Sequence, residues 1–174
     1  VYDKADRPIE GLSVRLVLDS NFPVDGVTDG NGMFSILVQI PFGTELGYHN
    51  LTATFAGNDY YIYNSTESRI FIKGETMILI DIPSSLEYNQ AYSGKITLVM
   101  HDGTPVSGAS LLVTFEPEGM TFLKITDLNG TATFGSVFQG NATSPVTVEI
   151  IYTGDEYYVG SSVQETIVYR SPVK

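Results

Sequence analysis

The sequence predicts an all-β protein made of two β-sandwich domains in tandem. Three observations carry this prediction: a motif repeat with a spacing of about 97 residues, short β-branched and aromatic runs between turn residues, and no helical periodicity. A repeating unit of that length is the size of one sandwich domain. We therefore expect two such domains within the 174 residues.

The repeat is visible in three pairs of segments that recur in the same order and at nearly the same spacing. These pairs are residues 28–34 and 126–132, residues 55–61 and 152–158, and residues 8–11 and 105–108. Asp-Gly-Asn-Gly and Asp-Leu-Asn-Gly within the first pair supply residues that tolerate positive φ, as hairpin turns require. Each repeat is therefore expected to contain a hairpin at the same place.

The second repeat predicts seven strands, which is the number in an immunoglobulin-like sandwich. Alternation is clearest at Val146, Val148, Ile150 and Tyr152, which places these side chains together on a core face. The seven strands are expected at residues 76–82, 92–100, 109–115, 121–126, 131–138, 146–152 and 163–169.

The first repeat predicts five strands, at residues 12–19, 24–28, 33–40, 48–55 and 68–72. Aligned on the Pro-x-x-Gly turn, Val1 corresponds to about Val99, so this domain is expected to lack its N-terminal strands. We favour a chain cut within a longer protein over a strand supplied from elsewhere. An open sheet edge is a template for pairing, which predicts a strand-exchanged homodimer as one assembly.

The predicted domains are residues 1–73 and 74–174, joined at Lys73, Gly74 and Glu75. Three residues are too few to act as a flexible coil between domains. The sequence therefore predicts a semi-rigid arrangement of the two domains.

Two motifs of the second repeat resemble the Ig-like repeat domains of bacterial and archaeal cell-surface proteins, such as adhesins, invasins and S-layer-associated proteins. They are the Thr-Asp-x-Asn-Gly turn that leads into residues 131–134, and residues 151–158 followed by Ser161 and Ser162. Residues 1–40 also resemble the carboxypeptidase regulatory-like domain, a related sandwich. Both resemblances imply non-catalytic modules that stand outside the cell in arrays.

Composition argues against several classes of function. A formal charge of −11 and a pI near 4.4 repel phosphate backbones, so no nucleic-acid partner is expected. The chain contains no cysteine, which excludes disulfides, cysteine-ligated metals and thiol nucleophiles. His49 and His101 lie in different repeats without catalytic partners in the sequence, so we expect no enzyme activity.

One turn of the first repeat offers a weak candidate for calcium. Asp25, Asp29 and Asn31 place three oxygen-bearing side chains around it, and calcium takes six to eight oxygen ligands. The same residues suit a tight turn for backbone reasons alone. The expectation is therefore no cofactor, with calcium at this turn as the alternative.

Four sequons predict N-glycosylation of a surface protein. Their asparagines are Asn50, Asn64, Asn129 and Asn141. Asn64 and Asn141 are expected in loops and Asn129 in a hairpin turn, whereas Asn50 is expected to open a strand.

The leading hypothesis is a non-catalytic extracellular spacer or stalk at a cell surface. Its expected partners are neighbouring domains of the same protein, and surface-layer protein or polysaccharide is a further candidate partner. The alternatives are an adhesion or carbohydrate- or protein-binding module, and an accessory domain of a secreted protease or transglutaminase. Eleven tyrosines could stack on sugars, but the pairs Tyr60-Tyr61 and Tyr157-Tyr158 recur at one repeat position, which favours a structural role.

Overall fold

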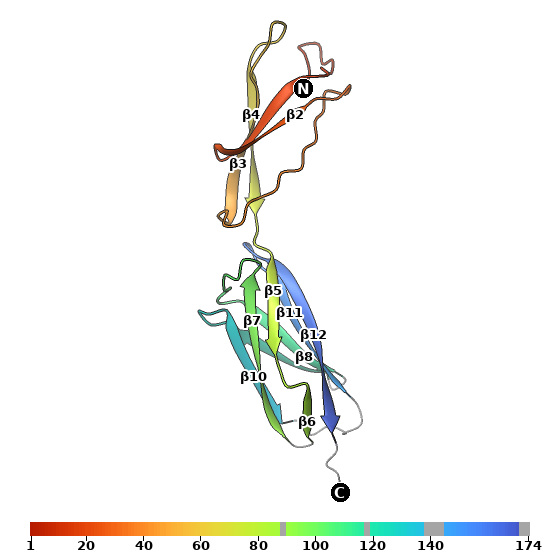
Figure 1. Ribbon diagram of the computed structural model, residues 1–174, viewed down its shortest axis with the longest axis vertical. Coiled ribbons are helices and arrows are strands. Elements are labelled where there is room, and N and C mark those ends of the chain that lie inside the picture. The colour runs from red at the N-terminus through yellow and green to blue at the C-terminus, as the bar shows by residue number, and fades with distance from the viewer. Residues whose placement is uncertain (88–89, 117–118, 138–144, 171–174) are drawn as a thin grey trace. The chain divides into compact units, whose positions relative to one another are not determined.

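The computed structural model describes residues 1–87, 90–116, 119–137 and 145–170, which form β-strands, turns and extended segments. These ranges contain no helix that could cross a membrane. The chain divides into two compact units, Val1–Ile72 (unit 1) and Lys73–Lys174 (unit 2), drawn in Figure 1. The all-β prediction is confirmed.

Unit 1 contains one antiparallel sheet of four strands in the order β2-β1-β3-β4. Its strands are β1 (Ser13–Leu18), β2 (Asn21–Val27), β3 (Gly47–Phe55) and β4 (Asn64–Ile72). Asp19 and Ser20 connect β1 to β2 with φ of 45° and 64°, the two positive values of a type I′ hairpin turn. The fourth strand starts four residues earlier than predicted, so Asn64 opens a strand and does not lie in a loop.

Unit 2 contains two sheets, of three strands in the order β10-β7-β5 and of five strands in the order β6-β12-β11-β8-β9. The strands are β5 (Thr76–Asp81), β6 (Ser85–Glu87), β7 (Ala91–Met100), β8 (Ser110–Glu116), β9 (Met120–Ile125), β10 (Thr131–Val137), β11 (Val146–Gly154) and β12 (Val159–Arg170). Seven of the eight match predicted strands, and only the short β6 was not predicted.

The core of unit 2 is made of alternate residues from both of its sheets. Ile96 and Leu98 on β7 are completely buried, as are Val148 and Ile150 on β11. The predicted core face of β11 is therefore confirmed. Burial of this kind on both inner faces is what holds a sandwich together.

The sheet of unit 1 repeats the larger sheet of unit 2 residue by residue. Leu16 pairs with Ala53 in unit 1, and Val113 pairs with Ile150 in unit 2, which is the same register at a spacing of 97 residues. The ladders β3–β4 and β11–β12 likewise correspond. The order β2-β1-β3-β4 is thus equivalent to β9-β8-β11-β12, and the sequence repeat is a structural repeat.

In each unit the hydroxyl of a buried threonine hydrogen-bonds to two backbone groups near the turns. Thr126 Oγ1 accepts the Ala109 N–H at 2.9 Å and donates to the Val106 carbonyl at 2.8 Å. The same two bonds join Thr28 Oγ1 to Leu12 and Ile9 in unit 1. A side-chain hydroxyl that satisfies buried backbone groups explains why threonine precedes the Asp-x-Asn-Gly turn in both repeats.

We expect Thr126→Val to destabilise unit 2 by about 1–3 kcal/mol, because valine keeps the shape but leaves the buried Ala109 N–H and Val106 carbonyl unsatisfied. Urea denaturation of the whole chain measures the loss. Thr131→Val is a control, since that hydroxyl makes only a 3.5 Å contact with the Asn129 carbonyl. Equal losses in the two variants would contradict the role given to Thr126.

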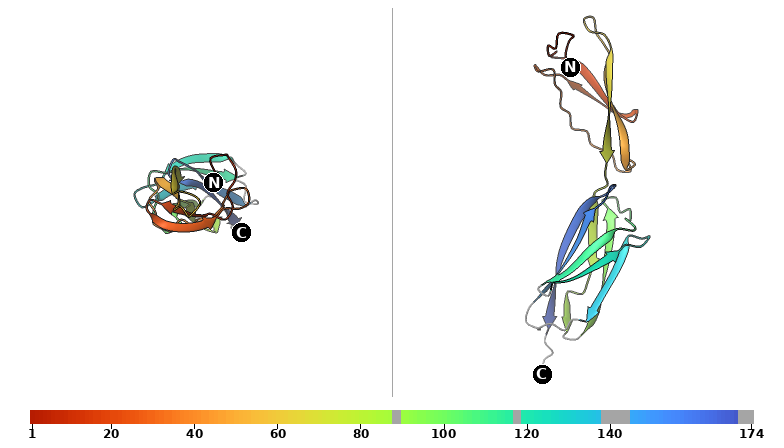
Figure 2. Two further views of the ribbon diagram at one scale, coloured as in Figure 1. Left: turned by 90° about the horizontal axis from the view of Figure 1, so that it is seen from above. Right: turned by 180° about the vertical axis from the view of Figure 1, so that it is seen from behind.

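The predicted strand at residues 33–40 is wrong in one respect: these residues pair with no strand in the described parts of the chain. They run extended beside the sheet of unit 1, as Figure 2 shows from behind. The equivalent strand in unit 2, β10, takes all its ladder bonds from β7. Apolar alternation predicts an extended conformation, whereas a strand also needs a partner.

Candidate functional site

The turn aspartates act on the backbone in both units. Asp29 Oδ1 accepts the N–H groups of Asn31 at 2.8 Å and Met33 at 3.0 Å, and these bonds lower the pKa of Asp29. Asp127 Oδ1 makes the equivalent pair of bonds, with Asn129 and Thr131. The turn chemistry that the sequence predicts is therefore present twice.

The three calcium candidates are not drawn together by mutual contacts. Asp25 lies on β2 opposite Arg15, whose Nε and Nη2 donate to its two carboxylate oxygens at 2.8 and 3.0 Å. Asp29 is engaged with its own turn, and Asn31 is exposed. In the part of the chain that the structure describes, no three acidic or histidine side chains form a group able to hold a metal ion.

Three of the four sequon asparagines are exposed: Asn50 on β3, Asn64 at the start of β4 and Asn129 in its turn. Asn50 is the fourth residue of its strand and does not open it. Asn141 lies outside the described residues. Glycosylation at these positions stays a prediction.

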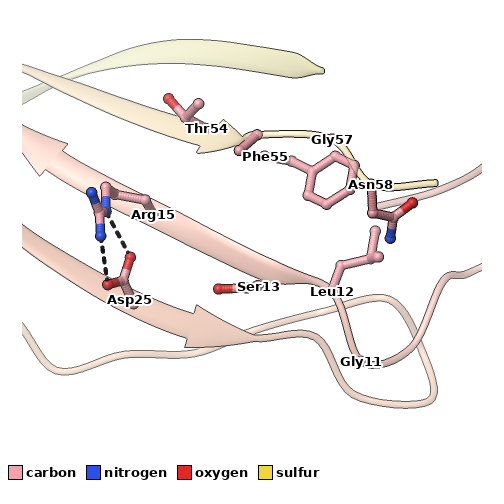
Figure 3. A pocket seen from close by; sticks show the side chains of 10 residues that line it. Gly11, Leu12, Ser13, Arg15, Asp25, Thr54, Phe55, Gly57 and Asn58 are labelled. Atoms are coloured by element: carbon pink, nitrogen blue, oxygen red, sulfur yellow. Dashed lines mark hydrogen bonds and ion pairs between the residues drawn. The ribbon is translucent and has the colours of Figure 1, made fainter. Parts of the chain in front are cut away.

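Unit 1 has a hollow of about 600 Å³ between β1 and the end of β3. Figure 3 shows Leu12 and Phe55 side by side at one end and the Arg15–Asp25 ion pair at the other. Both apolar side chains are buried, at 5% and 9% exposure. The hollow therefore has an apolar end and a polar end.

A second hollow of about 650 Å³ shares Leu12 and Phe55 and continues to a rim of larger apolar side chains. Tyr60 and Ile62 on this rim are 89% and 84% exposed. The rim also includes Tyr2, Tyr61 and Tyr63. Exposed apolar side chains gathered around a hollow are typical of an interaction surface, so we define Leu12, Phe55 and residues 60–63 as the candidate site.

The recurring tyrosine pairs are not equally structural. Tyr157 is 46% exposed, and its counterpart Tyr60 is almost fully exposed. Tyr158 packs against the core of unit 2 as a partly buried residue. The structural role that the repeat suggested therefore fits the second tyrosine of the pair in unit 2 and does not fit Tyr60.

A buried histidine next to a carboxylate was not predicted. His49 on β3 is 8% exposed; its Nδ1 contacts the Asp19 carboxylate, and its Nε2 donates to the Glu45 carbonyl at 2.7 Å. Asp19 also accepts the Asn50 N–H at 2.8 Å. The hydrogen bond to Asp19, followed by that to Glu45, raises the pKa of His49. The Asn50 N–H, followed by His49, lowers the pKa of Asp19.

Unit 1 is therefore expected to lose stability as the pH rises above 6.5, the ordinary pKa of histidine. A raised folded-state pKa stabilises the protein fully below 6.5 and ceases to do so as the pH passes the folded-state pKa. The lowered pKa of Asp19 acts in the opposite sense, and its contribution is lost on acidification from 3.8 downwards. Stability of unit 1 should thus be greatest between about pH 4 and 6.5.

Urea midpoints of unit 1 measured from pH 5 to 8 check this expectation. In His49→Gln the side chain cannot take up a proton, so the decline in midpoint above pH 6.5 should flatten. The exposed His101, beside Glu75 at 3.8 Å in unit 2, supplies the control variant His101→Gln. An unchanged pH profile in His49→Gln would contradict the role assigned to the pair.

Comparisons with known proteins leave the family open. No family model matches the chain, and no curated protein matches it. A β-glucuronidase of Parabacteroides merdae aligns at 12% identity and a TM-score of 0.32, over 89% of this chain and 21% of the glucuronidase chain. Domains 4 and 5 of the S-layer protein SbsC align at 13% identity and a TM-score of 0.33, over 89% of this chain and 98% of that chain.

Proposed function

We propose that this chain is a non-catalytic spacer of an extracellular surface protein, built from tandem immunoglobulin-like sandwiches. The path of the polypeptide through unit 2 is the observation that supports it. The Thr76 hydroxyl at the start of β5 donates to the carbonyl of Val159, the first residue of β12, at 2.7 Å. Strand β12 ends at Arg170, 11 residues on, which is roughly 36 Å away for an extended strand.

The residues that join the two units are bonded to unit 2. Gly74 donates to the Tyr157 carbonyl at 2.9 Å and accepts from the Val159 N–H at 2.8 Å, while Lys73 Nζ donates to the Asp155 carbonyl at 2.8 Å. Strand β4 ends at Ile72, directly before them. Hydrogen bonds to the body of unit 2 thus begin directly after β4, which supports the spacer proposal.

The C-terminal strand also suits a protein that is held at both ends. Strand β12 pairs in parallel with β6, with Val168 opposite Ser85 and its N–H donating to the Ser84 carbonyl at 3.0 Å. Tension along β12 acts across these bonds, so they must shear together before the strand leaves. We infer that unit 2 unfolds as one cooperative block under load.

Single-molecule stretching of the whole chain, held at its two ends, tests this proposal. Unit 2 should extend in one step of about 300 Å, since Lys73 through Arg170 is 98 residues, an unfolded residue spans at most ~3.6 Å, and the folded length of roughly 36 Å is subtracted. The full chain kept at the same pH without load should show no hydrolase activity. Gradual extension of unit 2 without a distinct step would refute the spacer.

A binding module is the second candidate, and the exposed rim of residues 60–63 favours it. Tyrosine presents an apolar face and a polar tip, which suits a sugar ring. A glycan array probed with the chain and with Tyr60→Ala distinguishes the two functions, with Tyr157→Ala as the matched control from unit 2. Binding that is lost only in Tyr60→Ala would assign carbohydrate recognition to the site.

A further inference from the structure

We propose that unit 1 binds a pair of antiparallel strands built like β5 and β7, donated by another polypeptide segment, on the inner face of its sheet. The inner face consists of the side chains of β1, β3 and β4 that correspond to the core of unit 2, and the candidate site lies at its end. This inference goes beyond the spacer function, because it concerns what completes unit 1.

The first observation is a difference in burial between equivalent positions. The two sheets share one register, so equivalent side chains should be buried equally if equal layers cover them. Three residues of unit 1 are only partly buried where their equivalents are 0% exposed: Leu16 against Val113, Ala53 against Ile150, and Ile70 against Ile167. Val14 and Leu18 on the same face of β1 are only 3% exposed, so the inner face of unit 1 is covered in part and is less covered around these three residues.

The second observation concerns the strands that cover the equivalent inner face in unit 2. Ile78 on β5 and Ile96 and Leu98 on β7 are buried on the core, and β7 lies between β5 and β10. The counterpart of β10 in unit 1 is residues 33–39, which run extended and have no ladder partner among the described residues. Their backbone is the edge on which a β7-like strand would form.

The loop at the candidate site presents the same backbone hydrogen-bonding groups that hold the start of β5 in unit 2. There, Gly74 just before β5 bonds to the Tyr157 carbonyl and the Val159 N–H. The equivalent groups in unit 1 are the Tyr60 carbonyl and the Ile62 N–H, and neither makes a hydrogen bond in the described structure. The exposed rim is thus the place where the first residues of the donated pair would dock.

The turn bonds of unit 1 fix the register of the donated β7-like strand. The Val1 carbonyl accepts the Ile9 N–H at 3.1 Å, as the Leu98 carbonyl accepts the Val106 N–H at 3.0 Å. Val1 therefore holds the place of Leu98. A donated strand in the register of β7 would place its residue equivalent to Thr97 opposite Met33, as Thr97 pairs with Thr131 in unit 2.

Side-chain size limits which strand fits. In unit 2, Gly94 lies opposite Phe134, and a Cβ on Gly94 would come within 2.3 Å of that ring. In unit 1 the phenylalanine, Phe34, comes two residues earlier, at the position equivalent to Ala132. In unit 2 that position pairs with Ile96. The donated strand should therefore carry a small residue opposite Phe34.

The probe is a synthetic peptide with the sequence of residues 73–97 and the change Ile96→Ala. We expect it to protect the amides of residues 33–39 from hydrogen exchange and to raise the thermal midpoint of unit 1 by about 5 °C or more at saturation. A control peptide that also carries Ile78→Asp should do neither. Ile62→Pro in the chain removes one docking amide and should weaken peptide binding at least 10-fold.

Equal effects of the two peptides, or no added protection of residues 33–39 with the first, would overturn the proposal. The peptide comparison does not depend on Ile62→Pro remaining folded, because it uses the unaltered chain. Analytical ultracentrifugation without peptide tests whether a second copy of the chain occupies the inner face instead. A concentration-dependent dimer in which residues 33–39 are already protected would assign the inner face to that second copy. This result would overturn strand donation by another segment. A failure of the peptide leaves the stretching result for unit 2 unaffected.

Discussion

Replacing Ile167 with alanine should destabilise unit 2 by about 2–5 kcal/mol, because the side chain is 0% exposed and its removal leaves a cavity. Ile70 holds the equivalent position on β4 and is only partly buried. Ile70→Ala should therefore cost unit 1 less, about 1 kcal/mol. Urea denaturation, with the two transitions assigned by hydrogen exchange, measures both losses.

This pair of variants compares the same substitution in the same register, so strand propensity and chemistry cancel. Adding the donated peptide should raise the cost of Ile70→Ala toward that of Ile167→Ala, because the side chain becomes covered. Equal losses in the two variants without peptide would mean that the inner face of unit 1 is already as well covered as the core of unit 2.

Gly130→Ala should destabilise unit 2 by about 3 kcal/mol. The residue has a φ of +69°, which L-residues other than glycine rarely adopt, and an added Cβ would lie 2.4 Å from the Leu98 carbonyl oxygen. Relief of that contact requires β7 to move against the core. The thermal midpoint of unit 2 and the heat of its transition measure the effect.

Gly103→Ala separates backbone strain from collision. Gly103 has a φ of +86°, but an added Cβ would meet nothing within 4 Å, so only the strain of about 1 kcal/mol is expected. A loss in Gly130→Ala no larger than that in Gly103→Ala would show that the approach of the Leu98 carbonyl carries no cost. The equivalent Gly32 has the same φ and lies against the Val1 carbonyl.

Local chemistry explains why so much of the strand pattern could be predicted. The alternation of Val146, Val148 and Ile150 defines one face of a strand without reference to any neighbour. The Asp-x-Asn-Gly turns need only their own residues, since Asp127 Oδ1 bonds within four positions. The spacing of 97 residues reappears in the strand pairing because residues 97 positions apart occupy equivalent places in the two sheets.

Features that depend on a distant partner could not be predicted. His49 and Asp19 are 30 residues apart and meet only because β3 pairs with β1. Residues 33–40 have the alternation of a strand but no ladder with any other described residue, because a ladder requires a neighbouring backbone. The candidate site was missed for the same reason: exposure of Tyr60 beside Leu12 and Phe55 is a property of packing.

The all-β class, the period of the repeat, the hairpin turns and the core face of β11 follow from the amino-acid sequence alone. These depend on the alternation of side chains and on residues that tolerate positive φ, both of which are local. The pairing of Asp25 with Arg15, the burial of His49 and the unequal cover of equivalent faces in the two units became apparent in the folded structure. Burial and pairing join residues far apart in the chain, and no local pattern specifies them.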